Sequence, residues 1–123
     1  MEKENALKDK SFAFAVRIVN TCRYLRSKHN EYKLSDQLLR SGTVIGALHR
    51  EAEQAESTPD FIHKLAIAQK ECYETMYWLE LFHATELIET KSFESIHADA
   101  CELMRIITAI LLTTKTKQLI AKK

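Results

Sequence analysis

Apolar residues recur every three to four positions over four long segments of the chain, and polar stretches separate these segments. One apolar stripe along each segment is the pattern of an amphipathic helix, because an α-helix turns once in about 3.6 residues. The pattern predicts helices at about residues 8–27, 36–54, 59–84 and 92–117. Since the connections are short, we expect a single all-α domain over residues 1–123, an up-down-up-down four-helix bundle.

The first segment offers two neighbouring apolar rows. One contains Phe12, Val16, Val19 and Cys22, and the other contains Phe14, Ile18 and Leu25. The later segments have clearer core stripes, which run from Leu38 to Ala52, from Phe61 to Phe82 and from Phe93 to Ile110. The third stripe alternates by four and three residues, which is the periodicity of bundles and coiled coils.

Local start signals support three of the helices. Ser35 is expected to cap the second helix, and Ser57 or Thr58 the third, with Pro59 in its first turn. The fourth helix is expected to begin near Ser92.

Two glycines, Gly42 and Gly46, fall inside the second segment. Each costs a helix about 1 kcal/mol relative to alanine. We therefore expect close packing of another helix, or a bound partner, to offset this cost.

The third and fourth segments carry additional apolar side chains beside their core stripes. These side chains are Ile62, Met76, Tyr77 and Trp78 in the third and Met104, Leu111 and Leu112 in the fourth. A helix in an isolated bundle needs only one buried stripe. We therefore expect a homo-oligomer that covers the second faces.

Composition agrees with a helical protein of the cytoplasm. The chain has 46% apolar residues but only two glycines and one proline, too few turn residues for a β-sandwich or barrel. The charged start lacks a secretory signal, and the longest apolar run, Ile106–Leu112, is far shorter than a membrane span. Three cysteines without a C-x-x-C motif, Cys22, Cys72 and Cys101, are expected to be reduced thiols.

The net charge of +1 conceals an uneven distribution. Residues 1–50 contain ten Lys/Arg and five Asp/Glu, residues 51–114 contain four and twelve, and residues 115–123 add four lysines. Such a split predicts complementary faces between helices or between subunits, or ordinary solvated helix faces.

Two short patterns suggest chemistry, and we interpret both as chance. Glu80/His83 and Glu94/His97 are both Glu-x-x-His, as in di-iron bundles. However, they flank one loop, and the middle of the first segment has no acidic partner. We expect no metal and no cofactor.

Arg23 and His29 have roughly the spacing of the Arg/His pair of HEPN-type ribonucleases. His29 falls in the predicted linker, so we expect no catalytic site there. An RNA-processing enzyme remains the alternative to a binding protein.

The densest polar cluster spans the second and third segments. Its members are Arg40, Ser41, Glu51, Lys64, Glu71, Glu74 and Thr75. We interpret an Arg40–glutamate pair between the helices as a device that sets their register, with a ligand or partner pocket as the alternative.

These residues also carry a family resemblance, which covers nearly the whole chain. The run from Leu38 to Ala47, then Arg50-Glu51-Ala52, and a second block from Ser57 to Leu79 resemble a bacterial four-helix bundle family. Its founding members are encoded in intervening sequences of 23S ribosomal RNA genes. The related accessory variability (Avd) proteins of diversity-generating retroelements are basic pentamers that bind a reverse transcriptase and nucleic acid. The resemblance therefore implies a homo-oligomer, with a pentamer favoured.

The chain departs from the family pattern at two positions of the second segment. Val44 stands where the family usually has Ser, and Leu48 where it usually has Asn. Either a functional pocket is impaired, or an apolar core has replaced polar contacts.

We expect a non-enzymatic, homo-oligomeric interaction protein whose candidate partners are RNA or DNA, with a structural assembly protein for a protein partner as a further alternative. The candidate nucleic-acid-binding residues are Arg17, Arg23, Arg26, Lys28, Lys115 and Lys117.

Overall fold

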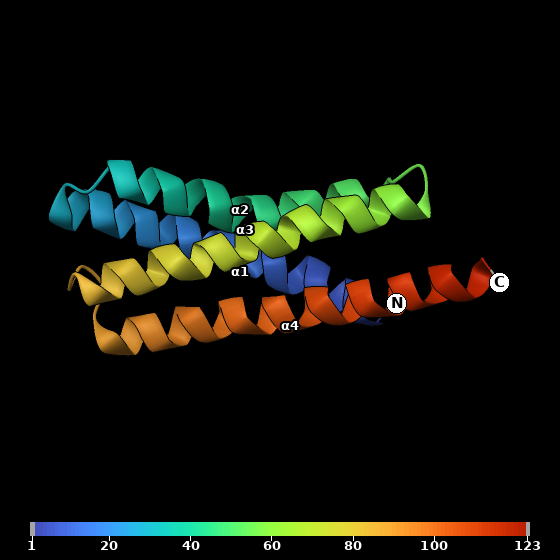
Figure 1. The fold of residues 1–123 in the computed structure, drawn as a ribbon. Coiled ribbons are helices and arrows are strands. Elements are labelled where there is room, and N and C mark those ends of the chain that lie inside the picture. The colour runs from blue at the N-terminus through green and yellow to red at the C-terminus, as the bar shows by residue number, and fades with distance from the viewer. Residues whose placement is uncertain (1, 123) are drawn as a thin grey trace.

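The computed structural model describes residues 2–122 and confirms the all-α four-helix bundle (Figure 1). The helices are α1 (Glu2–His29), α2 (Lys33–Glu53), α3 (Thr58–Ala84) and α4 (Thr90–Ala121). Each helix packs against its neighbours in the order α1, α2, α3, α4 and back to α1, and within the described chain the backbones of neither diagonal pair come close together. The cross-section is therefore a square with one core along its axis.

All four helices begin before their predicted starts, and at α2 this changes the cap. Ser35 does not cap α2: the cap is Tyr32, and the Ser35 hydroxyl lies buried inside the helix and donates to the Tyr32 carbonyl (3.1 Å). The Glu31 carboxylate takes the role of a cap instead, because it accepts from the backbone N–H of Leu34 (2.6 Å) and of Ser35 (3.3 Å). Helix α4 begins at Thr90, ahead of Ser92.

The cap of α3 is the one that the sequence predicts. The Ser57 hydroxyl accepts from the Asp60 backbone N–H at 3.2 Å, and Pro59 lies in the first turn. Helix α1 extends well beyond its predicted start, from Glu2.

The structure also decides between the two apolar rows of α1. The buried row comprises Leu7, Ser11, Phe14, Ile18, Cys22 and Leu25. In the other row Phe12 and Val16 face outward, with exposed fractions of 60% and 47%, while Val19 is partly buried and Cys22 is buried. Toward the N-terminus the Phe14 row continues into Ser11 and Leu7, so it can pack along the whole bundle and becomes the core face.

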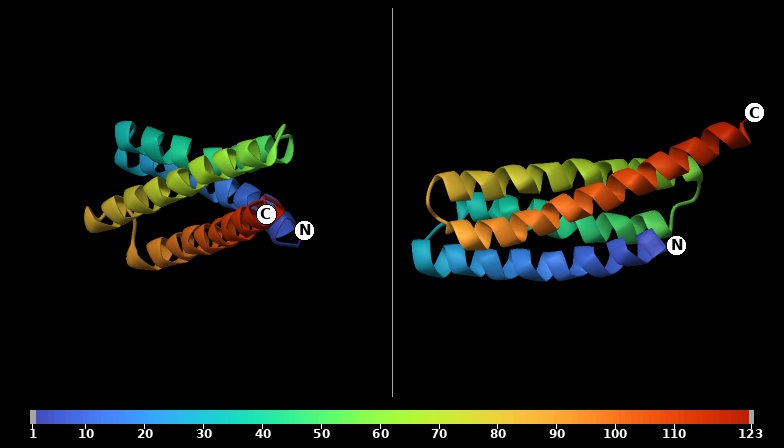
Figure 2. Two further views of the ribbon diagram at one scale, coloured as in Figure 1. Left: turned by 45° about the vertical axis from the view of Figure 1, so that its right-hand side comes forward. Right: turned by 90° about the horizontal axis from the view of Figure 1, so that it is seen from below.

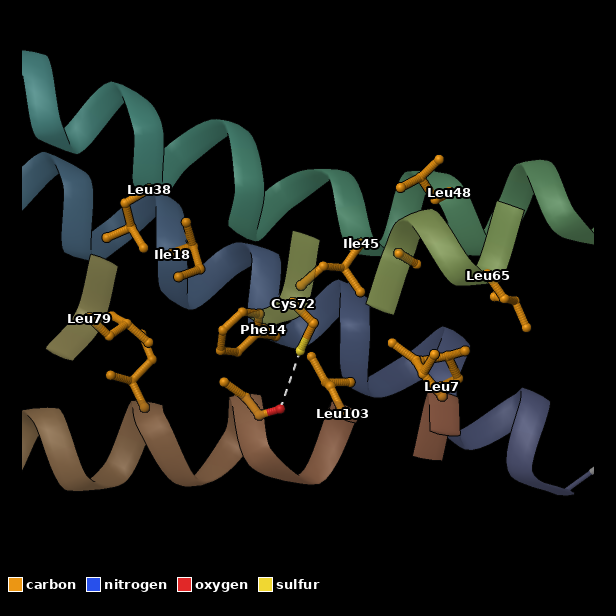
Figure 3. Packing of buried hydrophobic residues seen from close by; sticks show 14 of the residues in the cluster. Leu7, Phe14, Ile18, Leu38, Ile45, Leu48, Leu65, Cys72, Leu79 and Leu103 are labelled. Carbon is orange, nitrogen blue, oxygen red and sulfur yellow. Dashed lines mark hydrogen bonds between the residues drawn. The ribbon is translucent and has the colours of Figure 1, made fainter. Parts of the chain in front are cut away.

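The core stripes predicted for the other helices are confirmed except at their first aromatic residues, since Phe61 and Phe93 are only partly buried (Figure 3). Helix α2 buries the row from Leu38 to Ala52, and α3 buries the row from Leu65 to Phe82. Helix α4 buries Ile96 to Ile110 and also Leu111 from its second row.

Both glycines of α2 lie where α1 comes close. A side-chain β-carbon at Gly42 would lie 2.7 Å from Ile18 Cγ1, and one at Gly46 would lie 3.1 Å from Ser11 Oγ. Close packing of α1 therefore accounts for residues that are otherwise unfavourable in a helix.

The C-terminal turns of α4 project beyond the rest of the bundle (Figure 2). Leu119 and Ile120 are exposed there. Among the described helices, none combines the length and the hydropathy that a membrane crossing requires.

Candidate functional site

The polar cluster between α2 and α3 centres on Arg40. Its guanidinium donates to Glu71 (Nη1–Oε1, 3.0 Å) and also pairs with Glu74. The Trp78 indole donates to the same Glu74 carboxylate (Nε1–Oε2, 3.0 Å). One arginine of α2 is thus held by two carboxylates of α3, as expected from the sequence for a contact that sets helix register.

Behind this ion pair lies a buried hydroxyl contact. Thr75 Oγ1 is 2.9 Å from Ser41 Oγ, and both side chains are inaccessible to solvent. The remaining pair of the cluster, Lys64 and Glu51, joins Nζ to Oε1 at 3.1 Å. The seven residues therefore form three separate connections between α2 and α3.

Val44 and Leu48, the two departures from the family pattern, both pack in or against the hydrophobic core. Leu48 belongs to the buried cluster, and Val44 is a partly buried neighbour. An apolar core thus occupies these positions.

The uneven charge of the sequence is matched between helices of one chain. Four ion pairs join the basic first half to the acidic second half: Lys10–Glu102 (3.3 Å), Arg17–Asp99 (2.5 Å), Arg40–Glu71 (3.0 Å) and Arg40–Glu74. The first two connect α1 to α4, and the last two connect α2 to α3. The opposite charges of the two halves therefore pair with each other within a single bundle.

The six candidate nucleic-acid-binding residues do not form one surface. Arg17 donates to Asp99 and Ser95, and Arg26 donates to Asp36 and Ser35, so both are engaged. Within residues 2–122, Arg23 and Lys28 form no ion pair.

The two lysines of α4, Lys115 and Lys117, lie at the opposite end of the bundle. Lys117 lines a recess together with Glu2 and Glu4 at the start of α1. Arg23 is about 30 Å away along α1, at about 1.5 Å per residue.

Two exposed tyrosines accompany Arg23 and Lys28. Tyr24 lies on α1 and Tyr32 at the start of α2. The Tyr24 hydroxyl is 3.3 Å from His29 Nε2, and the two rings meet edge to face. In the described chain no hydrogen bond joins His29 to Arg23.

A recess lies beside these residues. It has a volume of about 550 Å³ and is lined by residues of α1, including Arg17 and Tyr24, and by Ile88 and Ile96. Its size is within the range of small-ligand sites.

The two Glu-x-x-His motifs meet crosswise. Glu80 of the first accepts from His97 of the second (Oε2–Nε2, 2.9 Å), while His83 contacts Thr90 and stacks on Phe93. Over residues 2–122 no three His, Cys, Asp or Glu side chains converge as metal ligands. The sulfur of Cys101, which belongs to neither motif, lies 3.7 Å from His97 Nδ1.

His49 is a buried polar residue that the sequence analysis did not single out. Its exposed fraction is 0%, and within residues 2–122 neither ring nitrogen has a hydrogen-bond partner. Burial lowers the pKa of His49 below 6.5, although Glu53 and Glu4 act in the opposite direction. Its position in the sequence, four residues after the core residue Ile45, could have indicated this burial.

Comparison with known proteins finds a matching family and a similar solved structure. Residues 3–109 match the family described as 23S rRNA-intervening sequence protein. A crystal structure of a protein of unknown function from the S23 ribosomal protein family of Bacteroides thetaiotaomicron is 52% identical, with a TM-score of 0.87. The match covers 89% of this chain and 97% of that chain. No curated protein matches.

Proposed function

Since the chain belongs to the 23S rRNA-intervening sequence protein family, we propose that it is a non-enzymatic interaction protein of the cytoplasm, assembled from several copies of this bundle. The observation that carries the proposal is the pair of unlike apolar patches on different sides of the molecule.

The first patch, called here the α1 patch, consists of Phe12 and Val16. Both face solvent, and the Arg50 guanidinium of α2 lies 5.8 Å from the centre of the Phe12 ring. An arginine over an aromatic face is a pairing that is common at protein interfaces.

The second patch, called here the α3–α4 patch, consists of Tyr73 and Tyr77 of α3, whose exposed fractions are 70% and 56%. Tyr73 and Met104 of α4 line one recess, together with Gln69. Gln69 Nε2 donates to Thr108 Oγ1 (3.0 Å), which ties α3 to α4 beside this recess.

Helices α1 and α3 stand at diagonal corners of the square, so the two patches face different directions. A contact between unlike patches is heterologous, and repeated heterologous contacts form a ring when the rotation between successive copies closes. The family resemblance favours five copies, with a mass near 71 kDa for a chain of 14.2 kDa.

Light scattering coupled to size exclusion tests this assembly. We expect a mass of several chains for the wild type and about 14.2 kDa for Phe12→Asp. The matched control is Ala13→Asp, which adds the same charge to the next exposed position of α1. A monomeric wild type, or a Phe12→Asp protein with unchanged mass, would contradict the proposal.

A second candidate function is nucleic-acid binding, favoured by Arg23 and Lys28 among the exposed rings of Tyr24 and Tyr32. Cations contact phosphates, and tyrosine rings stack on unpaired bases. We expect fluorescence anisotropy to show single-stranded RNA binding that weakens as salt rises.

The double variant Arg23→Ala/Lys28→Ala tests whether RNA binds at this end of the bundle. It is expected to weaken RNA binding, whereas Lys115→Ala/Lys117→Ala, at the other end of the bundle, removes equal charge without effect. Equal losses in the two variants would refute a site at this end. Cleavage of the RNA that His29→Ala abolishes would instead favour an RNA-processing enzyme.

A further inference from the structure

Three side chains on the outer seam between α3 and α4 form a connected series. The Cys101 sulfur is 3.7 Å from His97 Nδ1, and His97 Nε2 is 2.9 Å from the Glu80 carboxylate. His97 and Cys101 are four residues apart on α4, so the helix itself brings them together. Glu80 comes from α3.

The order of these contacts determines which nitrogen of His97 carries the proton. An ionised carboxylate only accepts hydrogen bonds, so Glu80 holds the hydrogen on Nε2 and leaves the lone pair of Nδ1 toward the Cys101 thiol. Phe93 packs on the imidazole, with ring centres 4.9 Å apart, and restricts its rotation. A nucleophile, a base and a group that orients the base are thus in sequence.

The other two thiols have surroundings of a different kind. Cys22 donates to the Ser35 carbonyl (3.3 Å) and Cys72 to the Ala100 carbonyl (3.4 Å; Figure 3). Both are buried, and burial raises the pKa of Cys22 to about 11 and that of Cys72 to about 12. They stay protonated, whereas Cys101 is partly accessible and faces a base.

We propose that Cys101 is a thiol-modification site that exchanges with low-molecular-weight disulfides, with His97 as its base and Glu80 as a positioning residue. The thiol proton passes to His97 Nδ1, and the sulfur attacks one sulfur of the disulfide. A Cys101–S–S–R bond forms as the original S–S bond breaks. The departing thiolate takes the proton from His97, so Cys101 is oxidised and half of the reagent is reduced.

A neutral reagent, dipyridyl disulfide, provides the test, with released thiopyridone measured by absorbance and the modified residue identified by peptide mass spectrometry. We expect one thiol per chain to react in the fast phase, located at Cys101 and absent from Cys101→Ser. His97→Gln is expected to slow this phase roughly tenfold or more at neutral pH. Glu80→Gln is expected to slow it less, because the amide holds the ring but not the tautomer.

The matched control is His83→Gln. His83 stacks on Phe93 with ring centres 4.3 Å apart and does not contact Cys101. It should leave the rate unchanged. A Cys101 rate that is equal in the wild type and in folded His97→Gln would overturn the proposal.

A neighbouring subunit on the seam would shield the thiol, so the rate is also measured in Phe12→Asp. Slow reaction in the wild type and fast reaction in Phe12→Asp supports the proposal, with the thiol covered in the assembly. A Cys101 no faster than Cys22 and Cys72 in both proteins overturns it. Neither result depends on whether the protein binds RNA.

Discussion

Ile18 of α1 occupies the space that a side chain at Gly42 of α2 would need, with its Cγ1 2.7 Å from the site of the missing β-carbon. Ile18 is fully buried and surrounded by core residues, so it has no room to retreat. The absence of a side chain at Gly42 therefore sets how closely α1 and α2 approach.

Gly42→Ala is expected to destabilise the protein although alanine favours helices. The gain in helix propensity is about 1 kcal/mol, while overpacking costs about 1–3 kcal/mol, and the clash with Ile18 makes the overpacking cost the larger of the two. Urea unfolding measures the difference. Gly46→Ala is the control, because its nearest neighbour is Ser11 Oγ at 3.1 Å, and we expect a change within about 0.5 kcal/mol.

Replacement of His49 by leucine is expected to raise stability. Both ring nitrogens are buried and have no hydrogen-bond partner among the described residues, and an unsatisfied buried polar group costs about 1–3 kcal/mol. Leucine has a similar size and no polar atom to desolvate. Thermal unfolding at pH 8, where the imidazole is neutral, measures this cost without a contribution from ring protonation. A less stable His49→Leu protein would show that the imidazole makes polar contacts.

His49 is also expected to make stability depend on pH. Its pKa is lowered in the folded state, so as pH falls below about 6.5 the unfolded chain binds a proton before the folded one does. The free energy of unfolding therefore decreases below that pH and stays higher above it. The charged groups that act on it are Glu4 and Lys8 of α1 and Glu53 and Arg50 of α2.

Urea unfolding between pH 8 and pH 5 checks the direction. The decrease should be smaller in His49→Leu than in the wild type. His63→Gln, which removes an exposed histidine of α3, should retain it. Parallel curves for the wild type and His49→Leu would rule out His49 as a source of the pH dependence.

The buried Ser41–Thr75 contact predicts a non-additive pair of substitutions. Thr75→Val preserves shape but leaves Ser41 without its 2.9 Å partner, which is expected to cost about 1–3 kcal/mol. Adding Ser41→Ala removes this hydroxyl, which would otherwise keep only its long contact to the Leu38 carbonyl (3.4 Å), and should recover part of the loss. A double-mutant cycle by urea unfolding tests the coupling. Additive effects would mean that the hydroxyls do not act as a pair.

Glu86, in the loop between α3 and α4, has a φ of 64°. A residue with a β-carbon is strained in this left-handed region by about 1–2 kcal/mol, whereas glycine is not. Glu86→Gly is therefore expected to raise the midpoint of thermal unfolding. Thr85→Gly, at an adjacent position with φ of −94°, is the control and should lower it.

The candidate site could be predicted only in part from the sequence. The Arg40 cluster could be predicted, because its members lie beside the core stripes of consecutive helices. The crosswise pairing of Glu80 with His97 could not, because the two motifs lie on different helices and their relative height depends on the loop. The ion pairs of Lys10 with Glu102 and of Arg17 with Asp99 could not be predicted either, for the same reason.

The amino-acid pattern was sufficient to predict four amphipathic helices and the residues of the last three that form the core, since an apolar stripe of helical period can be buried in only one way. The packing of the helices was needed to show that Phe14 rather than Phe12 faces inward, that Ser35 lies inside α2, and that His49 is buried. Each of these depends on what a neighbouring helix covers. Local periodicity reports the faces of one helix, and burial is a property of the contacts between helices.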